Sequence, residues 1–505
     1  MSIGSQLALE GIMRPIVSPG RIRGGRTLGR RADAPGGRTS GAGVLPPVRA
    51  APVPADDVDA APNNGASAAV VAAAIQRRRV VMGRSSGSAP TAGALAICDY
   101  RQRIPRAAPK STLATMSALS VAVGRRIART LTSPALREVS RGGHDWRRRL
   151  SGREAVVHYF HQPGDPYSAL AAGLLPALRS RYRIRLETHA VPPPDAAAAP
   201  DALRLAAWAA FDAARLAQRL GMSPQVALPE GLATDAAALR RGGALRAKLG
   251  HYQGAMFHFE GEWYWGVDRL HYLESRLQSL GLAREAAAPL APPPPLRWET
   301  PVPGTGRPQL DFFCSLRSPY TWLAVPRVRR LAAHYGAELR LRMVLPMVMR
   351  GLPVPWPKRR YILLDAKREA ERLGLPFGDV ADPVGAPVER GLALVHHAEQ
   401  QGCGIEVAES FLRGVFAEGM DAGSDRGLAR IATRAGLDAA DVRSALADTA
   451  WRGIAEANRV EMLARGLWGV PSFRVEGCAA VWGQDRLWMI EDDLIAHAKT
   501  QEGET

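Results

Sequence analysis

Cysteine is scarce in this chain, whose 505 residues include four of them. They are Cys98, Cys314, Cys403 and Cys478. None belongs to a CxxC pair or stands at a spacing typical of metal ligands, so we predict no metal site. So few cysteines in a chain of this length provide no disulfide framework. The sequence therefore favours a reducing compartment, and we expect a cytoplasmic protein.

Long apolar runs are also missing. No stretch reaches the roughly 18 apolar residues that a membrane-spanning helix needs, and the N-terminus has no clear signal-peptide core. Acidic residues are few in one part of the chain only. Residues 1–153 hold 25 Lys and Arg against 8 Asp and Glu, which leaves 41 basic and 40 acidic residues elsewhere. The net charge of +18 thus belongs to the N-terminal part, and we expect no nucleic-acid partner.

This N-terminal part falls into two segments. Residues 1–115 are rich in Ala, Gly, Pro and Arg and show no sustained period, which predicts a disordered leader. Two other interpretations stay open: an organelle transit peptide, because the leader is Arg-rich and acid-poor, or a translation start at Met116. Residues 116–153 have a basic, helical pattern, which is typical of a solvated helix or of one lying on a partner or membrane surface.

What the sequence does contain is one pattern written twice. "AVVHYF", "PYSALAAGLLPALRSRY" and "RIRLETHAV" predict a strand, a helix and a strand, and "QLDFFC", "PYTWLAVPRVRRLAAHY" and "AELRLRMVL" repeat that order. One offset of 153 residues aligns six positions, including Pro166 with Pro319 and Tyr167 with Tyr320. Each copy closes with an apolar run, Glu-Gly and Trp-Gly-x-Asp-Arg-Leu. The pattern predicts a tandem duplication.

Two α/β units are therefore expected, over residues 154–284 and 309–505. A Pro-rich linker, residues 285–308, would join them as a semi-rigid extended spacer. Each unit would contain β-α-β, a helical insertion, a β-hairpin and a last helix. This order favours a mixed sheet with helices packed on it.

Three features of the second unit indicate a binding site. Ser318 stands between a strand and a helix, where backbone N–H groups favour a thiolate or an anion, although on this motif alone a plain N-cap is the favoured interpretation. Pro471 in "GVPSF" is either a cis proline, which would present the Val470 backbone to a peptide-like ligand, or a trans proline at a strand start. Gln484 and Asp485 begin the last helix, where Asp485 is a helix-start residue or a partner for a ligand amine.

These motifs in this order resemble a known group. A strand, "SPYTWLA", a helical insertion, "GVPSF" and "WGQDRL" are similar to the DsbA-like proteins that include 2-hydroxychromene-2-carboxylate isomerase and kappa-class glutathione transferase. The segment "PWPKRRYILLDAKREAERLGLPF", with Lys358, Tyr361 and Asp365, and the segment "FAEGMD" also match, so the resemblance covers about residues 309–498. It implies an α/β fold of two tandem thioredoxin-like (DsbA-like) domains with helical insertions, preceded by a disordered basic N-terminal segment.

The resemblance also implies chemistry. Ser318 would take the place of the first cysteine of a redox CxxC and stabilise the thiolate of glutathione, the implied cofactor. Val470, before a cis Pro471, would pair with the cysteinyl backbone of glutathione. In the isomerase reaction that thiolate adds reversibly to a conjugated aromatic acid, a bond rotates and the thiol leaves.

The remaining implied contacts involve three side chains. Gln484 and Asp485 would bind the γ-glutamyl end of glutathione, and Lys358 would lie near the substrate or the glutathione carboxylate. The segment before Lys358, "MRGLPVPWPK", lacks the Asn-Lys/Arg-Pro-Pro of the group. Thr321 fills the second cysteine position, which excludes disulfide exchange by a vicinal pair. Cys314 is expected to be a small core residue.

The first unit departs from the pattern at the positions tied to thiol binding. Asp165 replaces Ser318, and a carboxylate there would repel a thiolate. Ala255 replaces Pro471, while Asp268 still matches Asp485. We therefore expect this unit to be structural or to bind another ligand. The nearby histidines are expected to be packed or solvated; they are His158, His161 and His189.

Two functions follow as hypotheses. The first is a glutathione-dependent isomerase- or transferase-like enzyme, which acts through the second unit on a small aromatic compound. The second is a noncatalytic tandem thioredoxin-like protein that binds a peptide or protein partner. A disulfide oxidoreductase is disfavoured, because neither unit has a CxxC. A homodimer is left open, and so is a duplication that buries a dimer-type surface within one chain.

Overall fold

The structure, a computed structural model, describes residues 118–222, 228–301 and 307–503, so the predictions for the leader (residues 1–115) lie outside it. All described residues belong to one compact unit, Arg101–Thr505. None of the helices in these ranges is both long and apolar enough to cross a bilayer, as predicted.

The basic segment before the first sheet forms two helices. They are α2 (Ala118–Leu131) and α3 (Pro134–Leu150). Some of their arginines are exposed, but others bond acidic side chains of both halves of the chain. Arg125 of α2 donates to Asp379 at 2.8 Å, and Arg141 of α3 donates to Glu262 at 2.6 Å. The segment therefore packs as part of the fold.

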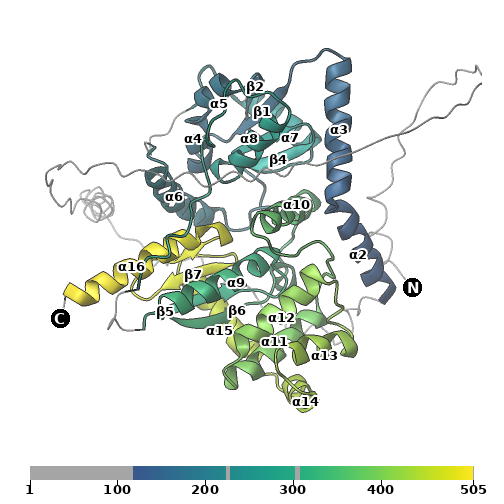
Figure 1. Ribbon diagram of the computed structural model, residues 1–505, viewed down its shortest axis with the longest axis vertical. Helices are drawn as coiled ribbons and strands as arrows, with labels where there is room; N and C mark the ends of the chain where they lie inside the picture. Colours follow the sequence, from purple (N-terminus) through teal and green to yellow (C-terminus); the bar gives the residue numbers. More distant parts are fainter. Residues whose placement is uncertain (1–117, 223–227, 302–306, 504–505) are drawn as a thin grey trace, which may run out of the picture. The chain divides into compact units, whose positions relative to one another are not determined.

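The first half has a four-stranded mixed sheet in the order β2-β1-β3-β4. Its strands β1, β2 and β4 are labelled in Figure 1. β1 is parallel to β2 and antiparallel to β3, and β3 pairs with β4 as a hairpin. The strands are β1 (Val156–His161), β2 (Arg185–Ala190), β3 (Met256–Phe259) and β4 (Glu262–Trp265). The helices are α4 (Pro166–Ala172), α5 (Leu175–Arg181), α6 (Ala202–Arg219), α7 (Ala236–Lys248), the 3-10 turn η1 (Val267–Arg269) and α8 (Leu270–Ser279).

One predicted helix of this half is in fact two. The sequence predicts a continuous helix after Pro166, whereas α4 ends at Ala172 and α5 starts at Leu175. Gly173 lowers helix propensity at the break, and Pro176 lacks the N–H that would continue the hydrogen-bond ladder.

The second half repeats the topology, with a sheet in the order β6-β5-β7-β8 and the same strand directions. Its strands β5, β6 and β7 are labelled in Figure 1. Its strands are β5 (Gln309–Cys314), β6 (Glu338–Met343), β7 (Ser472–Val475) and β8 (Val481–Trp482). The helices before the hairpin are α9 (Pro319–His334), η2 (Met347–Arg350), α10 (Trp356–Arg372), α11 (Ala386–Gln400), α12 (Gly404–Ala417), α13 (Asp425–Arg434), α14 (Ala439–Ala447) and α15 (Trp451–Ala464). After the hairpin come η3 (Gln484–Arg486) and α16 (Leu487–Gly503). The predicted element order is confirmed in both halves.

Hydrogen bonds and backbone angles explain why the closing motif recurs. Gly261 and Gly477 have φ values of 84° and 77°, which favour glycine in the tight turn after each Glu. The Gly266 N–H donates to the Ala255 carbonyl at 2.7 Å, and the Gly483 N–H donates to the Pro471 carbonyl at 3.0 Å. Ala255 and Pro471 therefore occupy equivalent places.

The linker between the halves is held rather than free. Its described part up to residue 301 contains no helix or strand. The Arg297 and Trp298 N–H groups both donate to the Glu491 carboxylate of α16, at 2.6 and 2.7 Å. The extended spacer that the prolines predict is thus fastened to the second half.

The halves are joined by arginines from their closing motifs. Arg269 of the first half donates from Nε to Asp365 and from Nη1 to Asp485, each at 2.9 Å. The Tyr320 hydroxyl also donates to Asp365, at 2.9 Å. Arg269 and Asp365 are almost wholly buried, so these ion pairs are shielded from solvent.

The second half forms equivalent bonds to the first half. Arg486 donates from Nε to Asp212 and from Nη1 to Asp268 of the first half, each at 2.7 Å. The Tyr167 hydroxyl donates to Asp212 at 2.7 Å. Each Trp-Gly-x-Asp-Arg-Leu motif therefore supplies an arginine to the aspartate of the other, and the two halves contact each other reciprocally.

Candidate functional site

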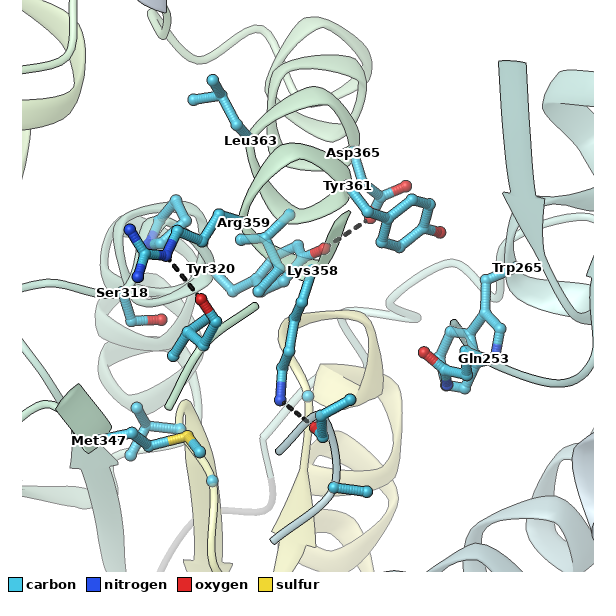
Figure 2. A pocket seen from close by; sticks show the side chains of 18 of the residues that line it. Gln253, Trp265, Ser318, Tyr320, Met347, Lys358, Arg359, Tyr361, Leu363 and Asp365 are labelled. Atoms are coloured by element: carbon cyan, nitrogen blue, oxygen red, sulfur yellow. Dashed lines mark hydrogen bonds between the residues drawn. The ribbon is translucent and has the colours of Figure 1, made fainter. Parts of the chain in front are cut away.

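A cavity of about 820 Å³ is lined by residues of α2, of the first half and of the second half. The start of α4 lines it from one half and the start of α9 from the other. Figure 2 shows Ser318 and Tyr320 from α9 near side chains of α10, with Gln253 and Trp265 of the first half across the pocket. The structure brings all the predicted site residues to this cavity: Ser318, Lys358, Val470, Pro471, Gln484 and Asp485.

Ser318 is the N-cap of α9. Its side-chain oxygen accepts a hydrogen bond from the Thr321 N–H at 3.2 Å, and Pro319 occupies the first helical position. The N-cap interpretation is therefore confirmed. It does not compete with binding, because a serine hydroxyl that accepts one bond still has its proton to donate.

The Val470–Pro471 peptide bond is cis, as one of the two interpretations of "GVPSF" predicts. The preceding glycine is required by packing, because a Cβ on Gly469 would lie 2.3 Å from the Trp482 ring. The Ser472 hydroxyl donates to the Gly469 carbonyl at 2.8 Å and fastens the turn. The Val470 backbone is thereby held at the cavity wall.

Lys358 enters the cavity from the first turn of α10 (Figure 2). Its Nζ donates to the Ala198 carbonyl at 2.7 Å and lies 5.4 Å from the centroid of the Trp468 ring. Burial lowers the pKa of this amine to about 8. An ammonium group at this place, with no carboxylate bonded to it among the described residues, suits an anionic ligand.

The buried amine predicts a pH-dependent stability. Between pH 8 and 10.5 the unfolded chain keeps the Lys358 proton and the folded chain loses it, so the stability of the folded protein rises with pH across this window. We expect Lys358→Met to be more stable than the unsubstituted protein below pH 8, and this advantage to shrink toward pH 10.5. Urea unfolding at a series of pH values measures it.

A matched control is Lys248→Met, since Lys248 is exposed at the end of α7. That substitution should change stability little, with no trend over the same window. An advantage of Lys358→Met that stays constant from pH 7 to 10.5 would show that the amine is not the cause.

Gln484 and Asp485 line the cavity, but their side chains are already bonded within the protein. The Gln484 amide donates to Glu369 at 3.0 Å and accepts from Arg327 at 2.7 Å. Burial alone would raise the pKa of Asp485, but the guanidinium groups of Arg269 and Arg486 outweigh it and lower that pKa. The role of both residues in binding glutathione stays a prediction, and a ligand would have to share their present bonds.

The first half contributes more to the cavity than its sequence indicates. Asp165, the counterpart of Ser318, caps α4 by accepting from the Ser168 N–H and hydroxyl at 2.8 and 2.7 Å. Burial raises its pKa, although these bonds oppose the rise. Gln253 and Trp265 also line the wall. Of Gln253 and Trp265, only Trp265 carried a signal in the sequence, as part of the repeated closing motif.

Tyr361 of α10 was noted in the sequence without a role. It lines the cavity, and its buried hydroxyl has no hydrogen-bond partner among the residues that the structure describes. Its ring is nearly perpendicular to the His251 ring, with 4.9 Å between centroids. A polar ligand would give this hydroxyl a partner.

The thiols do not form a redox site in the described ranges, where Cys314, Cys403 and Cys478 are free. Cys314 is buried and donates to the Met343 sulfur at 3.2 Å, and burial raises its pKa well above the usual range. It is a core residue, as predicted. The Thr321 hydroxyl accepts from the Ser315 N–H at 3.5 Å and is fully buried.

The second half of the chain matches a known domain family. Residues 309–495 match the family model of the DSBA-like thioredoxin domain. The match begins with the first residue of β5 and ends within α16. The chain therefore contains a DsbA-like thioredoxin-fold domain of mixed α/β content. No curated protein matches the chain significantly.

Solved structures give distant similarities. One is 2-hydroxychromene-2-carboxylate isomerase, at 21% identity and a TM-score of 0.34, covering 39% of this chain and 99% of that protein. Another is the cytosolic disulfide reductase DsbM from Pseudomonas aeruginosa, at 21% identity and a TM-score of 0.32, covering 39% and 100%. The same reductase with GSH gives 20% identity and a TM-score of 0.29, covering 38% and 98%. Similarities this distant assign no activity.

Proposed function

We propose that the protein is a glutathione-dependent, isomerase- or transferase-like enzyme that acts on a small aromatic compound. The observation that carries the proposal is the meeting of three groups at one cavity: the Ser318 hydroxyl at a helix N-terminus, the Val470 backbone and the buried Lys358 amine. The volume, about 820 Å³, is within the range of small-molecule sites, about 300–1,000 Å³.

Each group has a task that fits glutathione. When bound, glutathione would supply a thiolate that adds reversibly to a conjugated substrate. The Ser318 hydroxyl would donate to that sulfur, helped by the N–H groups and dipole at the start of α9. The Val470 backbone would pair with the peptide portion, and the Lys358 ammonium would hold a carboxylate of glutathione or of the substrate.

The first half is proposed to be a diverged copy of the second. The shared strand order and the reciprocal bonds of Arg269 and Arg486 support this interpretation. They also support a duplication that covers, within one chain, the surface that a second copy would use. Asp165 in the place of Ser318 makes a second thiolate site in this half unfavourable.

A second candidate function has its own observation. Gln484 and Asp485, the predicted γ-glutamyl contacts, already bond Glu369, Arg327 and Arg269. Because these polar side chains are already bonded within the protein, the cavity also suits a noncatalytic protein that binds a peptide or protein partner through the same groove. Glutathione binding distinguishes the two candidates.

Ser318→Ala is expected to weaken glutathione binding by about tenfold or more, because a hydrogen bond to a charged group contributes about 1.5–3 kcal/mol. Calorimetric titration of the full chain with reduced glutathione measures the affinity, and thiolate absorbance measures the pKa of the bound thiol. That pKa should rise in the variant, an effect that a cap with a purely structural role would not produce.

Ser424→Ala is the matched control, since Ser424 caps α13 in the same way by accepting from the Gly427 N–H at 3.1 Å. Both variants lose a cap worth about 1 kcal/mol of stability, but only Ser318→Ala should lose affinity. Absence of glutathione binding by the unsubstituted chain would favour the partner-binding function instead.

A further inference from the structure

Three potential metal ligands meet on the first sheet, at residues far apart in the sequence. The His158 Nδ1 lies 3.1 Å from the His189 Nε2 and 3.2 Å from the Glu187 Oε2. The Glu187 Oε2 lies 3.9 Å from the His189 Nε2. Two atoms that each bind one tetrahedral ion at about 2.0–2.1 Å are separated by about 3.4 Å. The three atoms therefore already have the spacing of a shared coordination sphere.

The sheet register explains why these side chains converge. β1 and β2 are parallel, with His158 opposite Glu187 and Phe160 opposite His189. Side chains two residues apart in a strand share a face, so the two β2 ligands and His158 lie on the same face. The three side chains are 24%, 32% and 21% exposed for His158, Glu187 and His189, which leaves an ion a path from solvent.

The equivalent positions of the second sheet carry residues that form no such ligand set. There Asp311 is opposite Arg340 on β6 and Arg474 on β7. Arg342, in the place of His189, donates to Asp311 at 3.0 Å. The first half thus replaces one aspartate and three arginines by three histidines and a glutamate. The arginines cannot bind a metal ion, whereas imidazole and carboxylate can.

We propose that His158, Glu187 and His189 bind a divalent transition-metal ion such as Zn²⁺. Two imidazoles and one carboxylate form a three-ligand set that leaves a coordination position for water or a further ligand. The site lies on the half in which Asp165 stands in the place of Ser318, and it would give that half a binding function of its own.

Neighbouring groups support the set. Arg185 forms an ion pair with the other carboxylate oxygen of Glu187, at 3.1 Å, which favours the orientation of Oε2 toward the histidines. His258 lies opposite His158 on β3, with 6.1 Å between ring centroids. It is 8% exposed, and its Nδ1 has no hydrogen-bond partner among the described residues. A metal-bound water would give this buried nitrogen a partner.

The test is calorimetric titration of the full chain, first stripped with a chelator, with Zn²⁺. One saturable site per chain is expected, together with a thermal midpoint that rises with Zn²⁺ concentration. The double variant His158→Ala/His189→Ala should lose this site. Glu187→Gln preserves the shape and hydrogen bonding of the side chain and should weaken Zn²⁺ binding by at least about tenfold. Removal of a residue that only contacts a metal ligand already has an effect of about this size.

The matched control is His396→Ala/His397→Ala on α11, where the rings lie 3.4 and 3.0 Å from Asp448 and Asp441. These histidines also have carboxylate neighbours, so their removal tests whether any surface histidine suffices. The control should bind Zn²⁺ like the unsubstituted chain. Absence of a saturable site in the unsubstituted chain, or unchanged binding by the double variant or by Glu187→Gln, overturns the proposal.

Discussion

Replacing Arg269 by alanine is expected to lower the free energy of unfolding by about 3–5 kcal/mol, the cost of removing one partner from a buried ion pair. Arg269 bonds Asp365 and Asp485 across the two halves and is 3.8 Å from Glu369. Asp365 and Glu369 are each 1% exposed. Without the guanidinium, these carboxylates stay buried with less positive charge to balance them, and the folded state bears the desolvation cost.

Urea unfolding followed by circular dichroism measures this effect. The matched control is Arg413→Ala, because Arg413 is half-exposed and donates to Glu418 at 2.8 Å on the surface. An exposed pair of this kind contributes about 0.2–1 kcal/mol. Similar losses for both variants would contradict the idea that the buried arginines hold the halves together.

Phe257→Ala is expected to destabilise both halves, although Phe257 belongs to the first sheet alone. Its ring is fully buried against Tyr159, with 4.7 Å between centroids, and such a truncation costs about 3–5 kcal/mol. One apolar cluster runs through the cores of both halves, and the reciprocal arginine bonds cross between them. We therefore expect one cooperative unfolding transition.

Hydrogen exchange resolves this prediction by position. In Phe257→Ala, the protection of amides in β5 and β7 should fall together with that in β1 and β3. Phe473→Ala, in the core of the second sheet, should act on the first sheet in return, because Phe473 is equally buried. Phe211→Ala is the control, since that ring is 37% exposed. Retained protection in β5 and β7 would show that the halves unfold separately.

Local patterns in the sequence were sufficient for much of the fold. The apolar run at residues 309–314 is the strand β5 without a change of bounds, because strand periodicity and a following turn are properties of neighbouring residues. Ser318 before Pro319 predicted a helix start for the same reason. The helix after Pro166 was predicted too long, because Gly173 and Pro176 act together to interrupt it.

Bonds between distant residues could not be predicted in this way. Asp485 carried a binding role in the sequence, yet its carboxylate meets Arg269, 216 positions away. Gln484 was assigned to a ligand and is buried between Arg327 and Glu369. A helix-start motif predicts that a side chain is available for bonding. Its bonding partner depends on how the two halves pack.

The sequence by itself determined the two strand-helix-strand patterns, the helix-capping serine and the proline of the cavity wall, since each depends on a few consecutive residues. Only the tertiary structure decided that both halves line one cavity and that the arginine of each closing motif bonds the aspartate of the other. It also converted His158, Glu187 and His189 from scattered polar residues into a cluster. The register of β1 against β2 brings positions 31 residues apart to within 3.1 Å, and register arises from pairing between strands rather than from either strand alone.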